Sequence, residues 1–401
     1  MMLLGNVKDG KKIVWVSFLN LDFCNIISQT QILSHLAKRG HSVRLVVTGS
    51  KKEYGNNNSN GYHLTCIPFK YVPVGTPLFY LISLTFYLPF LFCSFKPDVV
   101  VFEPGSSIIG LIFKPLTRVL KVKTILDIRS TPVNIRNNFS DSLGLLAFKS
   151  AVLMAKKQFD GITILTDLMK NQLCTEFNLK SESLGVWNSG VSLDLFDPTK
   201  HNGKRLRATL GLGNKFVIFY HGAIGKGRLN GLLDSIKGLK FVKHPEQFAI
   251  FLLGEGTAIP VIRQLIQKEK LENNVFIHKK VDYSMVPEFI AMSDVGLVPL
   301  PDLPEWRYQC PLKLIEYLAM GKVAILTDIP AHREIVKDNP CGVFVGSIHP
   351  KDFADAMMFA YKNRQRLHEW GLTGRRIVEK SYSWEKIAEN FEGYLSSIGV
   401  I

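Results

Sequence analysis

The residue types best suited to chemistry gather within residues 311–334. The apolar residues there recur three and four positions apart, which predicts a helix with Lys313 and Glu316 on one side. Gly321 ends this helix, and residues 323–326 form a short apolar strand of the kind found in parallel sheets. A cation, a carboxylate and the unpaired amides of a helix start would therefore lie together. We expect a crevice that accepts a phosphate and a sugar or ribose hydroxyl.

Short apolar strands alternate with helical patterns along most of the chain, which is typical of parallel sheets covered by helices. The clearest predicted strands are 12–17, 42–47, 98–102, 124–128, 161–165, 216–220, 248–253, 275–278 and 295–298. The alternation stops near residues 186–210, where we place a linker. We predict an α/β protein with two Rossmann-like domains facing a cleft, residues 1–195 and 196–380, followed by a C-terminal helix within 381–401.

Length, composition and net charge limit the classes of molecule that this protein can bind. The chain has 401 residues, of which 46% are hydrophobic, so it is long enough for two cores. Its formal charge of +15 indicates an anionic partner, either a nucleotide-type ligand or an anionic membrane surface. Because no basic block is interleaved with aromatic residues, we expect no nucleic-acid binding.

Cysteine usage and the N-terminus indicate the compartment. The six cysteines are far apart and form no C-x-x-C pair, so we expect buried thiols in a reducing compartment and no metal site. The first residues lack the order of a signal peptide, in which charge precedes a longer apolar run. We expect a cytoplasmic protein.

The segment Thr76–Phe95 contains no charged residue and is about long enough to span a bilayer. Pro89 interrupts it, and a span here would separate the predicted strand 98–102 from the residues that precede the segment. Three alternatives stay open: a helix that docks on the membrane face, a buried helix, and a true span. Charges introduced at Leu84 and Phe86 would test membrane docking.

Four motifs follow one another in a fixed order. They are Asn-Ser-Gly-Val-Ser-Leu-Asp-Leu-Phe at 188–196, Tyr-His-Gly-Ala at 220–223, Leu-Gly-Glu-Gly at 253–256 and the helical stretch 311–321. Together they resemble the retaining nucleotide-sugar enzymes of glycosyltransferase family four (group one), which have the GT-B fold. The resemblance covers nearly the whole chain. It implies that the second domain binds a nucleoside-diphosphate sugar, that the first binds the acceptor, and that the last helix crosses back to the first domain.

The resemblance also suggests roles for individual side chains. Glu316 matches the second Glu of the family's Glu-x7-Glu motif, whose carboxylate accepts ribose hydroxyls. The leaving diphosphate gains negative charge as the glycosidic bond breaks, so a cation that holds it stabilises the transition state more than the ground state. Lys313 is one candidate for that cation. Lys226 and Arg228, in the glycine-bearing loop after the first strand of the second domain, are the others.

Further contacts to the donor are implied nearby. The backbone at Pro311 and Leu312, at a helix start, is placed to hold the phosphates or the sugar. By resemblance alone, His278, Lys279 and Val281 lie beside the base. The nucleoside-diphosphate sugar is a co-substrate, and no separate cofactor is expected.

The sequence departs from the family pattern at three places. Tyr308 stands eight residues before Glu316, where the family has the first Glu of its motif, so the sugar is not specified. Residues 20–25 lack the family's Gly-Gly loop. Asp127 and Arg129 stand where many relatives have a His, at the expected cleft-facing end of a strand, and they are candidates to bind acceptor or phosphate or to form an internal ion pair.

Three functions remain in competition. The first is a retaining glycosyltransferase that needs no metal, since no Asp-x-Asp cluster lies at a strand end. It would move a sugar to a saccharide or lipid-linked acceptor in glycan or cell-surface polysaccharide synthesis. We expect peripheral contact with anionic lipid on the cytoplasmic face, and a soluble acceptor is the alternative. The second is a nucleotide-sugar epimerase, and the third is a non-catalytic relative that serves as a binding subunit.

Overall fold

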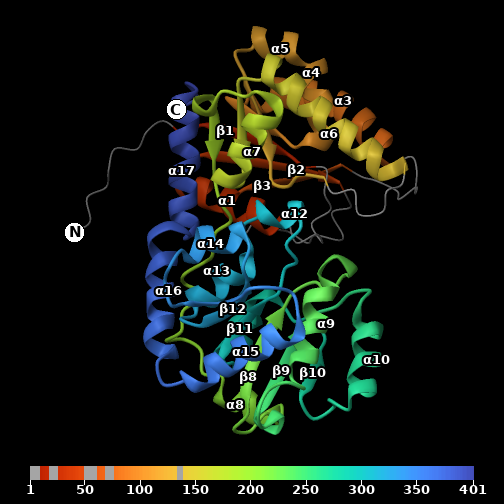
Figure 1. Ribbon diagram of the computed structural model, residues 1–401. Helices are drawn as coiled ribbons and strands as arrows, with labels where there is room; N and C mark the ends of the chain where they lie inside the picture. Colours follow the sequence, from red (N-terminus) through yellow and green to blue (C-terminus); the bar gives the residue numbers. More distant parts are fainter. Residues whose placement is uncertain (1–9, 18–25, 49–60, 68–75, 133–138) are drawn as a thin grey trace, which may run out of the picture. The chain divides into compact units, whose positions relative to one another are not determined.

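The computed structural model describes residues 10–17, 26–48, 61–67, 76–132 and 139–401 (Figure 1). The chain forms two compact units. Unit 1 consists of Met1–Asn188 together with Trp384–Ile401, and unit 2 consists of Ser189–Ser383. These limits differ by a few residues from the expected ones at 195 and 380. The predicted departure at residues 20–25 lies outside the described residues.

Unit 1 is built on a parallel sheet. Its described strands are β1 (Lys12–Val16), β2 (Ser42–Thr48), β3 (His63–Ile67), β4 (Val99–Phe102), β5 (Lys123–Ile128), β6 (Gly161–Ile164) and β7 (Leu184–Val186). Their order in the sheet is β3-β2-β1-β4-β5-β6-β7, so the chain changes direction between β1 and β4. The described helices are α1 (Ile26–Lys38), α3 (Thr76–Phe95), α4 (Ser107–Ile112), α5 (Lys114–Val119), α6 (Phe139–Gln158), α7 (Asp167–Phe177) and α17 (Trp384–Ser397).

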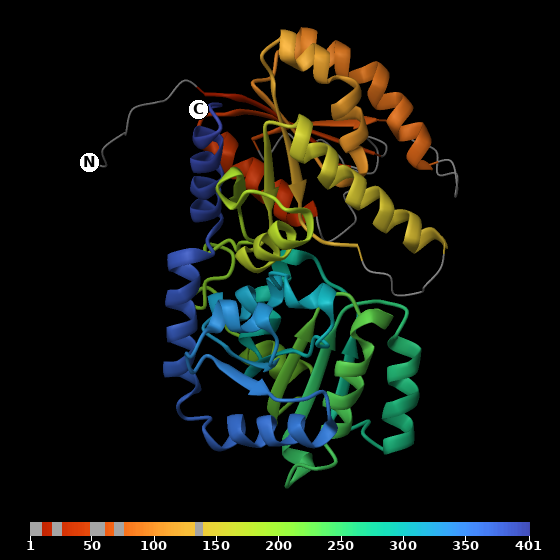
Figure 2. The ribbon, with the colours of Figure 1, turned by 45° about the horizontal axis from the view of Figure 1, so that its top comes forward.

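The C-terminal helix α17 packs in unit 1, beside α1 and β7 (Figure 2). Its Glu392 carboxylate accepts two hydrogen bonds of 2.7 Å from the Arg39 guanidinium. The Tyr394 hydroxyl accepts a 2.9 Å hydrogen bond from the amide of Ile162 in β6. The Tyr394 ring also fills the space that a side chain at Gly185 would need, because a Cβ there would lie 2.5 Å from the ring. Helix α17 is therefore a structural part of unit 1.

Unit 2 has a second parallel sheet. Its strands are β8 (Phe216–His221), β9 (Phe248–Leu253), β10 (Val275–His278), β11 (Val295–Val298), β12 (Val323–Thr327) and β13 (Gly342–Val345), in the order β10-β9-β8-β11-β12-β13. Its α-helices are α8 (Lys204–Thr209), α9 (Leu229–Gly238), α10 (Ile259–Glu269), α11 (Val286–Ala291), α12 (Pro304–Arg307), α13 (Leu312–Ala319), α14 (Pro330–Val336), α15 (Pro350–Lys362) and α16 (Leu367–Ser381). Two parallel sheets with helices confirm the predicted α/β fold with two Rossmann-like domains.

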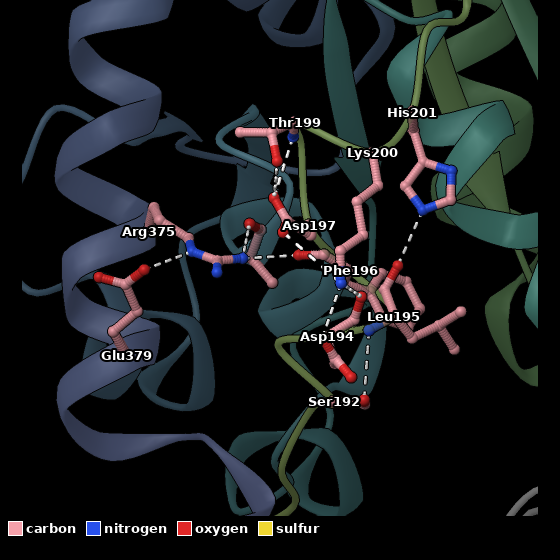
Figure 3. Close-up of polar contacts among 11 residues, drawn as sticks. Ser192, Asp194, Leu195, Phe196, Asp197, Thr199, Lys200, His201, Arg375 and Glu379 are labelled. Atoms are coloured by element: carbon pink, nitrogen blue, oxygen red, sulfur yellow. Dashed lines mark hydrogen bonds and ion pairs between the residues drawn. The ribbon is translucent and has the colours of Figure 1, made fainter. Parts of the chain in front are cut away.

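The residues that open unit 2 are fixed to helix α16 (Figure 3). Arg375 of α16 donates hydrogen bonds of 2.6 Å to the carbonyl oxygens of Phe196 and Ala319, the last residue of α13. Its Nε also lies 2.6 Å from the Glu379 carboxylate. A cation at the end of α13 satisfies a carbonyl that the helix leaves unpaired and complements the helix dipole. Arg375 thus joins the motif at 188–196 to the helix that carries Glu316.

Helix α3 lies over the sheet of unit 1 with one face buried. Tyr80, Leu84, Leu88 and Leu91 are at most 1% exposed, and they pack in one core with residues of β1, β2 and β4. None of the helices described has the length and apolar character needed to cross a bilayer.

Five of the six cysteines lie in the described part of the chain: Cys66 and Cys174 are half-buried, Cys93 is exposed, and Cys310 and Cys341 are buried. The expectation that the thiols are buried is wrong for Cys93, which lies on the exposed side of α3, and holds for Cys310 and Cys341. Burial raises the pKa of the Cys341 thiol to about 11.

Candidate functional site

The candidate site lies at the carboxyl ends of the central strands of unit 2. The chain runs from β8 outward through β9 to β10 and then returns to the other side of β8 as β11. Ligands of open parallel sheets bind where the strand order reverses in this way. The loop after β8 and helix α13, together with the residue before it, flank this point, and they contain six of the eleven predicted site residues: Lys226, Arg228, Pro311, Leu312, Lys313 and Glu316.

Glu316 is the central carboxylate. It lies on α13 and is 2% exposed. Its Oε1 accepts a 2.5 Å hydrogen bond from the hydroxyl of Tyr283, which lies in a 3₁₀ turn (Tyr283–Met285) after β10. Its Oε2 lies 3.2 Å from Nε2 of His221, although the pair lacks hydrogen-bond geometry. The carboxylate is therefore held by one neutral donor and faces a second polar group.

The local structure explains these positions. Side chains two residues apart on a strand share a face, so Phe219 and His221 of β8 point to the same side of the sheet. Tyr317 of α13 packs edge-on against both rings, with centroid distances of 6.1 and 5.2 Å, and its hydroxyl donates to the carbonyl of Phe219. Burial, together with the charge of Glu316, raises the pKa of Tyr283 well above its usual range. Tyr283 therefore acts as a hydrogen-bond donor and not as an anion.

Lys313 lies one turn before Glu316 on α13. Its Nζ is 4.2 Å from the centre of the Tyr220 ring, within the range of a cation–π contact. It is also 3.7 Å from the position that a Cβ at Gly222 would occupy. The ammonium thus reaches from α13 to the end of β8, so the predicted combination of a cation and a carboxylate near a helix start is present.

The loop after β8 is closely packed against its neighbour. Gly222 N donates to Leu253 O (2.9 Å), and a Cβ at Gly254 would lie 2.0 Å from Gly222 O. The φ angle of Gly254 is +155°, a conformation that L residues rarely adopt. The Leu-Gly-Glu-Gly motif is therefore a packing element that lets two strand-end loops touch.

The two loop cations predicted after β8 lie in a 3₁₀ turn, Lys226–Arg228, that leads into α9. The Arg228 guanidinium lies 5.0 Å from the ring centre of Trp306 on α12, and one of its nitrogens lies 3.5 Å from Ala223 O. Lys226 is exposed. Arg228 and Lys313 therefore both adjoin the short segment that follows β8, with Arg228 held over an aromatic ring.

The residues predicted beside a base lie on the same edge of the sheet. His278 ends β10, two strands from β8, and its backbone carbonyl accepts a 3.0 Å hydrogen bond from Gly254 N. Its imidazole Nδ1 lies 2.8 Å from the carbonyl of Lys279. Lys279 is exposed and Val281 is partly buried. Their role towards a base stays a prediction.

The helix start is open to a ligand's phosphate. Pro311 precedes α13 and Leu312 is its first residue, and both are partly exposed. The first ladder hydrogen bonds of α13 run from Leu314 and Ile315 back to Pro311 O, so the amides before them lie outside the ladder. Tyr308, which stands in place of the family's first Glu, follows α12 and is also partly buried.

The predicted acceptor residues lie in unit 1 and make internal contacts. Asp127 of β5 is 0% exposed, and its Oδ1 accepts hydrogen bonds from Thr163 (2.7 Å) and from the indole of Trp187 (2.8 Å). Burial raises the pKa of Asp127. Arg129 lies 3.5 Å from the Trp187 ring centre and donates to the Trp187 carbonyl. Asp127 is therefore covered by other residues of unit 1, and a role for either residue towards an acceptor stays a prediction.

His332 of α14 leads to a prediction on pH. It is 0% exposed, its Nδ1 lies 2.7 Å from Thr327 O, and burial lowers its pKa to about 4. Between pH 6.5 and 4 the unfolded chain therefore binds a proton that the folded chain does not, so stability falls as the pH falls through this window. Urea unfolding should show a loss of about 2 kcal/mol between pH 7 and pH 5.

A variant isolates this contribution. His332→Gln should reduce the dependence between pH 7 and pH 5, and part of what remains comes from His35 of α1, whose pKa is also lowered by burial. His368→Gln on the exposed side of α16 should keep the full dependence. An unchanged pH dependence in His332→Gln would contradict the assignment. Carboxylates with lowered pKa values, such as Asp328 beside Arg333, lose their contribution only at lower pH.

Three residues of the site were not assigned a role from the sequence: His221, Tyr283 and Trp306. His221 stands in the Tyr-His-Gly-Ala motif, and its place at the end of the first strand of unit 2 was a usable signal. Tyr283 and Trp306 gave no such signal, because each meets its partner only through the fold: Tyr283 is 33 residues from Glu316 and Trp306 is 78 residues from Arg228.

Comparisons with known proteins bear on the family and the fold. Residues 204–377 match the family model described as glycosyl transferases group 1, and this range contains β8 to β13 and the unit 2 residues described above. The chain carries a group 1 glycosyltransferase domain on a GT-B fold. The chain is 26% identical over 232 residues to a putative teichuronic acid biosynthesis glycosyltransferase, TuaH, of Bacillus subtilis, covering 57% of this chain and 55% of the relative.

Two further similarities extend the comparison. The chain is 21% identical over 266 residues to the poly(ribitol-phosphate) alpha-N-acetylglucosaminyltransferase of Staphylococcus aureus, which covers 66% of this chain and 50% of that protein. The chain thus spans about half the length of these curated relatives. Its fold is similar to that of Anabaena Alr3699/HepE, crystallised with UDP and glucose, with a TM-score of 0.76, 13% identity, and coverage of 96% of this chain and 100% of that one.

Proposed function

We propose that this protein is a retaining glycosyltransferase that moves a sugar from a nucleoside-diphosphate sugar to a saccharide or lipid-linked acceptor in the synthesis of a glycan or cell-surface polysaccharide. The observation that carries the proposal is the buried Glu316 carboxylate, one helical turn from Lys313, at the strand ends where the order of the unit 2 sheet reverses. The group 1 domain match and the relatives in polysaccharide synthesis support it.

Glu316 is the proposed partner of the ribose. A ribose diol presents two hydroxyl donors, and a carboxylate accepts both. Tyr283 fixes one carboxylate oxygen through its hydrogen bond, and the other faces His221. The base then extends along the strand ends towards His278, Lys279 and Val281.

Lys313 and Arg228 are the proposed partners of the diphosphate. Both lie beside the segment after β8, and the backbone N–H of Leu312, which follows Pro311 as the first residue of α13, completes an anion site. Cations held at the leaving oxygens stabilise charge that appears only as the bond to the sugar breaks. In this proposal side chains neutralise the leaving group, Lys226 provides a further cation at the edge, and no metal or other cofactor is required.

Retention of the anomeric configuration places the leaving diphosphate and the incoming acceptor hydroxyl on the same face of the sugar. The leaving phosphate oxygen can then accept the proton of the hydroxyl while the new bond forms. This route asks for no protein carboxylate beside the sugar, and it is compatible with Tyr308 in place of the first Glu.

The proposed acceptor and the proposed location of the protein are based on its net charge and on the surface of helix α3. The proposed acceptor is a membrane-borne, lipid-linked or surface saccharide, reached by peripheral contact with anionic lipid on the cytoplasmic face of the membrane. The formal charge of +15 and the uncharged helix α3 support this contact.

A ligand panel tests the donor site. Thermal unfolding of the full chain is measured with nucleoside diphosphates and nucleotide sugars that differ in base and sugar. We expect one base to raise the melting temperature and the matching nucleotide sugar to be hydrolysed or transferred when acceptor is supplied. A wild-type protein that no nucleotide stabilises contradicts the proposal.

The panel also separates the competing functions. A non-catalytic subunit would be stabilised by a nucleotide sugar without hydrolysing or transferring it to any acceptor. An epimerase would convert the free nucleotide sugar into its epimer without an acceptor, which product analysis detects directly. The anomeric configuration of a transferred sugar then decides retention.

A further inference from the structure

The large hydrophobic side chains on the surface are unevenly distributed. Among the described residues, seventeen large hydrophobic side chains are exposed, and eleven of them lie between Phe79 and Leu153 of unit 1. These eleven belong to α3, α4, α5 and α6 or directly follow α5. Soluble monomers rarely expose contiguous apolar patches of this kind without an interaction partner. We therefore expect this part of unit 1 to be an interaction surface.

Helix α3 is apolar on two opposite sides. Phe79, Ile82, Phe86 and Phe90 recur at three- and four-residue intervals and are 63%, 47%, 78% and 65% exposed. The opposite side carries the buried residues that pack on the sheet. Because packing within unit 1 uses only the buried side, the exposed phenylalanines contribute nothing to that core. Leu84 belongs to the buried side, so a charge there would disrupt the fold and would not test docking.

The neighbouring helices present the same kind of outer side. Helix α4 contacts α3, α5 and α6, and the four helices lie together in both views of the ribbon (Figures 1 and 2). Ile109 of α4 and Leu116 of α5 pack into the same core as the inner side of α3. The exposed side chains of α4 and α5 therefore point away from the core on which α3 packs, and those of α6 lie opposite its own buried residues, such as Phe148 and Val152. The exposed side chains are Ile108 and Ile112 on α4, Val119 on α5, and Leu143, Leu146 and Leu153 on α6.

The charges on these helices have one predominant sign. Helices α3 and α4 contain no charged residue, and Asp141 is the sole acidic residue in α5 and α6. Exposed basic residues gather at the ends of α5 and α6, and they are Arg118, Lys121, Lys156 and Lys157. The acidic residue just after α6, Asp160, is paired with Lys114. The guanidinium of Arg118 lies 3.3 Å from the amide oxygen of Gln158, so the two basic ends adjoin. An apolar surface with basic residues at its edge matches an acyl layer covered by anionic headgroups.

We propose that the outer side of α3, α4, α5 and α6 docks on a bilayer that contains anionic lipid, with the phenylalanines of α3 inserted among the headgroups. The helices lie on the membrane surface and do not cross it. This surface gives the membrane contact of the proposed function a defined position. Because lipid binding needs no donor or acceptor, its test is independent of glycosyl transfer.

The test is co-flotation of the full chain with vesicles of phosphatidylcholine alone or mixed with phosphatidylglycerol. Wild type should float with the mixed vesicles, less with neutral ones, and less at higher ionic strength. Phe86→Ser/Phe90→Ser should weaken binding by roughly tenfold for each phenylalanine lost from the apolar layer. The melting temperature should not fall, because both side chains are already exposed.

A matched control variant separates specific docking from non-specific hydrophobic binding to vesicles. Phe241→Ser/Phe359→Ser removes two phenylalanines that are 58% and 50% exposed in unit 2, and it should bind vesicles as wild type does. Equal binding by the α3 variant and wild type would overturn the proposal. A wild type that stays in the soluble fraction at every lipid composition would also overturn the proposal. A third contradicting result is a wild-type dimer that binds no vesicles and that the α3 substitutions dissociate, because the face would then join two copies of the chain.

Discussion

Glu316→Ala will lower kcat/KM for the nucleotide-sugar donor by about 100-fold or more, mainly through a higher KM. Removing the carboxylate eliminates the acceptor of two ribose hydroxyls and leaves the buried hydroxyl of Tyr283 without its partner. Ribose contacts are made before and during bond breaking alike, so their loss weakens binding more than it slows chemistry. Steady-state kinetics and the thermal shift with the nucleoside diphosphate measure the effect.

Two variants refine this result. Glu316→Gln keeps the size and one acceptor oxygen, so it reports on the charge while limiting any loss of stability at a residue that is 2% exposed. Tyr283→Phe removes one hydrogen bond to a charged group and should cost about tenfold. Glu369→Ala on the exposed side of α16 is the matched control. A wild-type response to the nucleotide in Glu316→Gln and Glu316→Ala would rule out the ribose assignment.

Lys313→Ala will reduce kcat by roughly 10²–10³-fold, with a smaller change in donor affinity. Its ammonium lies beside Gly222 at the end of β8, where the diphosphate is proposed to bind, and it compensates charge that grows towards the transition state. Single-turnover transfer, measured with saturating donor, isolates the chemical step.

The variant Arg228→Ala shows whether Arg228 or Lys313 neutralises the leaving diphosphate. If the guanidinium over Trp306 supplies the charge instead, Arg228→Ala will lose kcat while Lys313→Ala stays within about fivefold of wild type. Lys362→Ala, an exposed lysine at the end of α15, controls for the general loss of positive charge. Unchanged kcat in both Arg228→Ala and Lys313→Ala would remove side-chain cations from the mechanism.

The central strands were predictable because each is a continuous apolar run. Strands β8, β9 and β11 are buried along their whole length, and the predicted ranges agree with the observed ones to within a residue. Strands β3, β7 and β13 were not predicted. Each lies at the edge of its sheet. Polar residues interrupt the apolar run in β3, β7 has only three residues, and the apolar run of β13 is three residues long.

The local part of the site was predictable for a similar reason. Lys313 and Glu316 are three residues apart on one helix, so their proximity follows from helix geometry alone. Neither contact of Glu316 outside α13 could be derived in this way, because His221 and Tyr283 come from other strands and turns. The contacts of Asp127 could not be derived from local sequence either, because the indole of Trp187, which donates a hydrogen bond to it, is 60 residues away.

The place of α17 has a consequence for how the protein is made. Unit 2 is one continuous stretch, so all of its residues have been synthesised once Ser383 leaves the ribosome. Unit 1, whose strands come first, still lacks the helix whose Tyr394 packs on Gly185 and whose Glu392 pairs with Arg39. Because domains generally fold as units during synthesis, the half that is translated first is the half that is completed last. Until α17 has been synthesised, the core of unit 1 is incomplete and exposes apolar surface, which makes the nascent chain prone to aggregate.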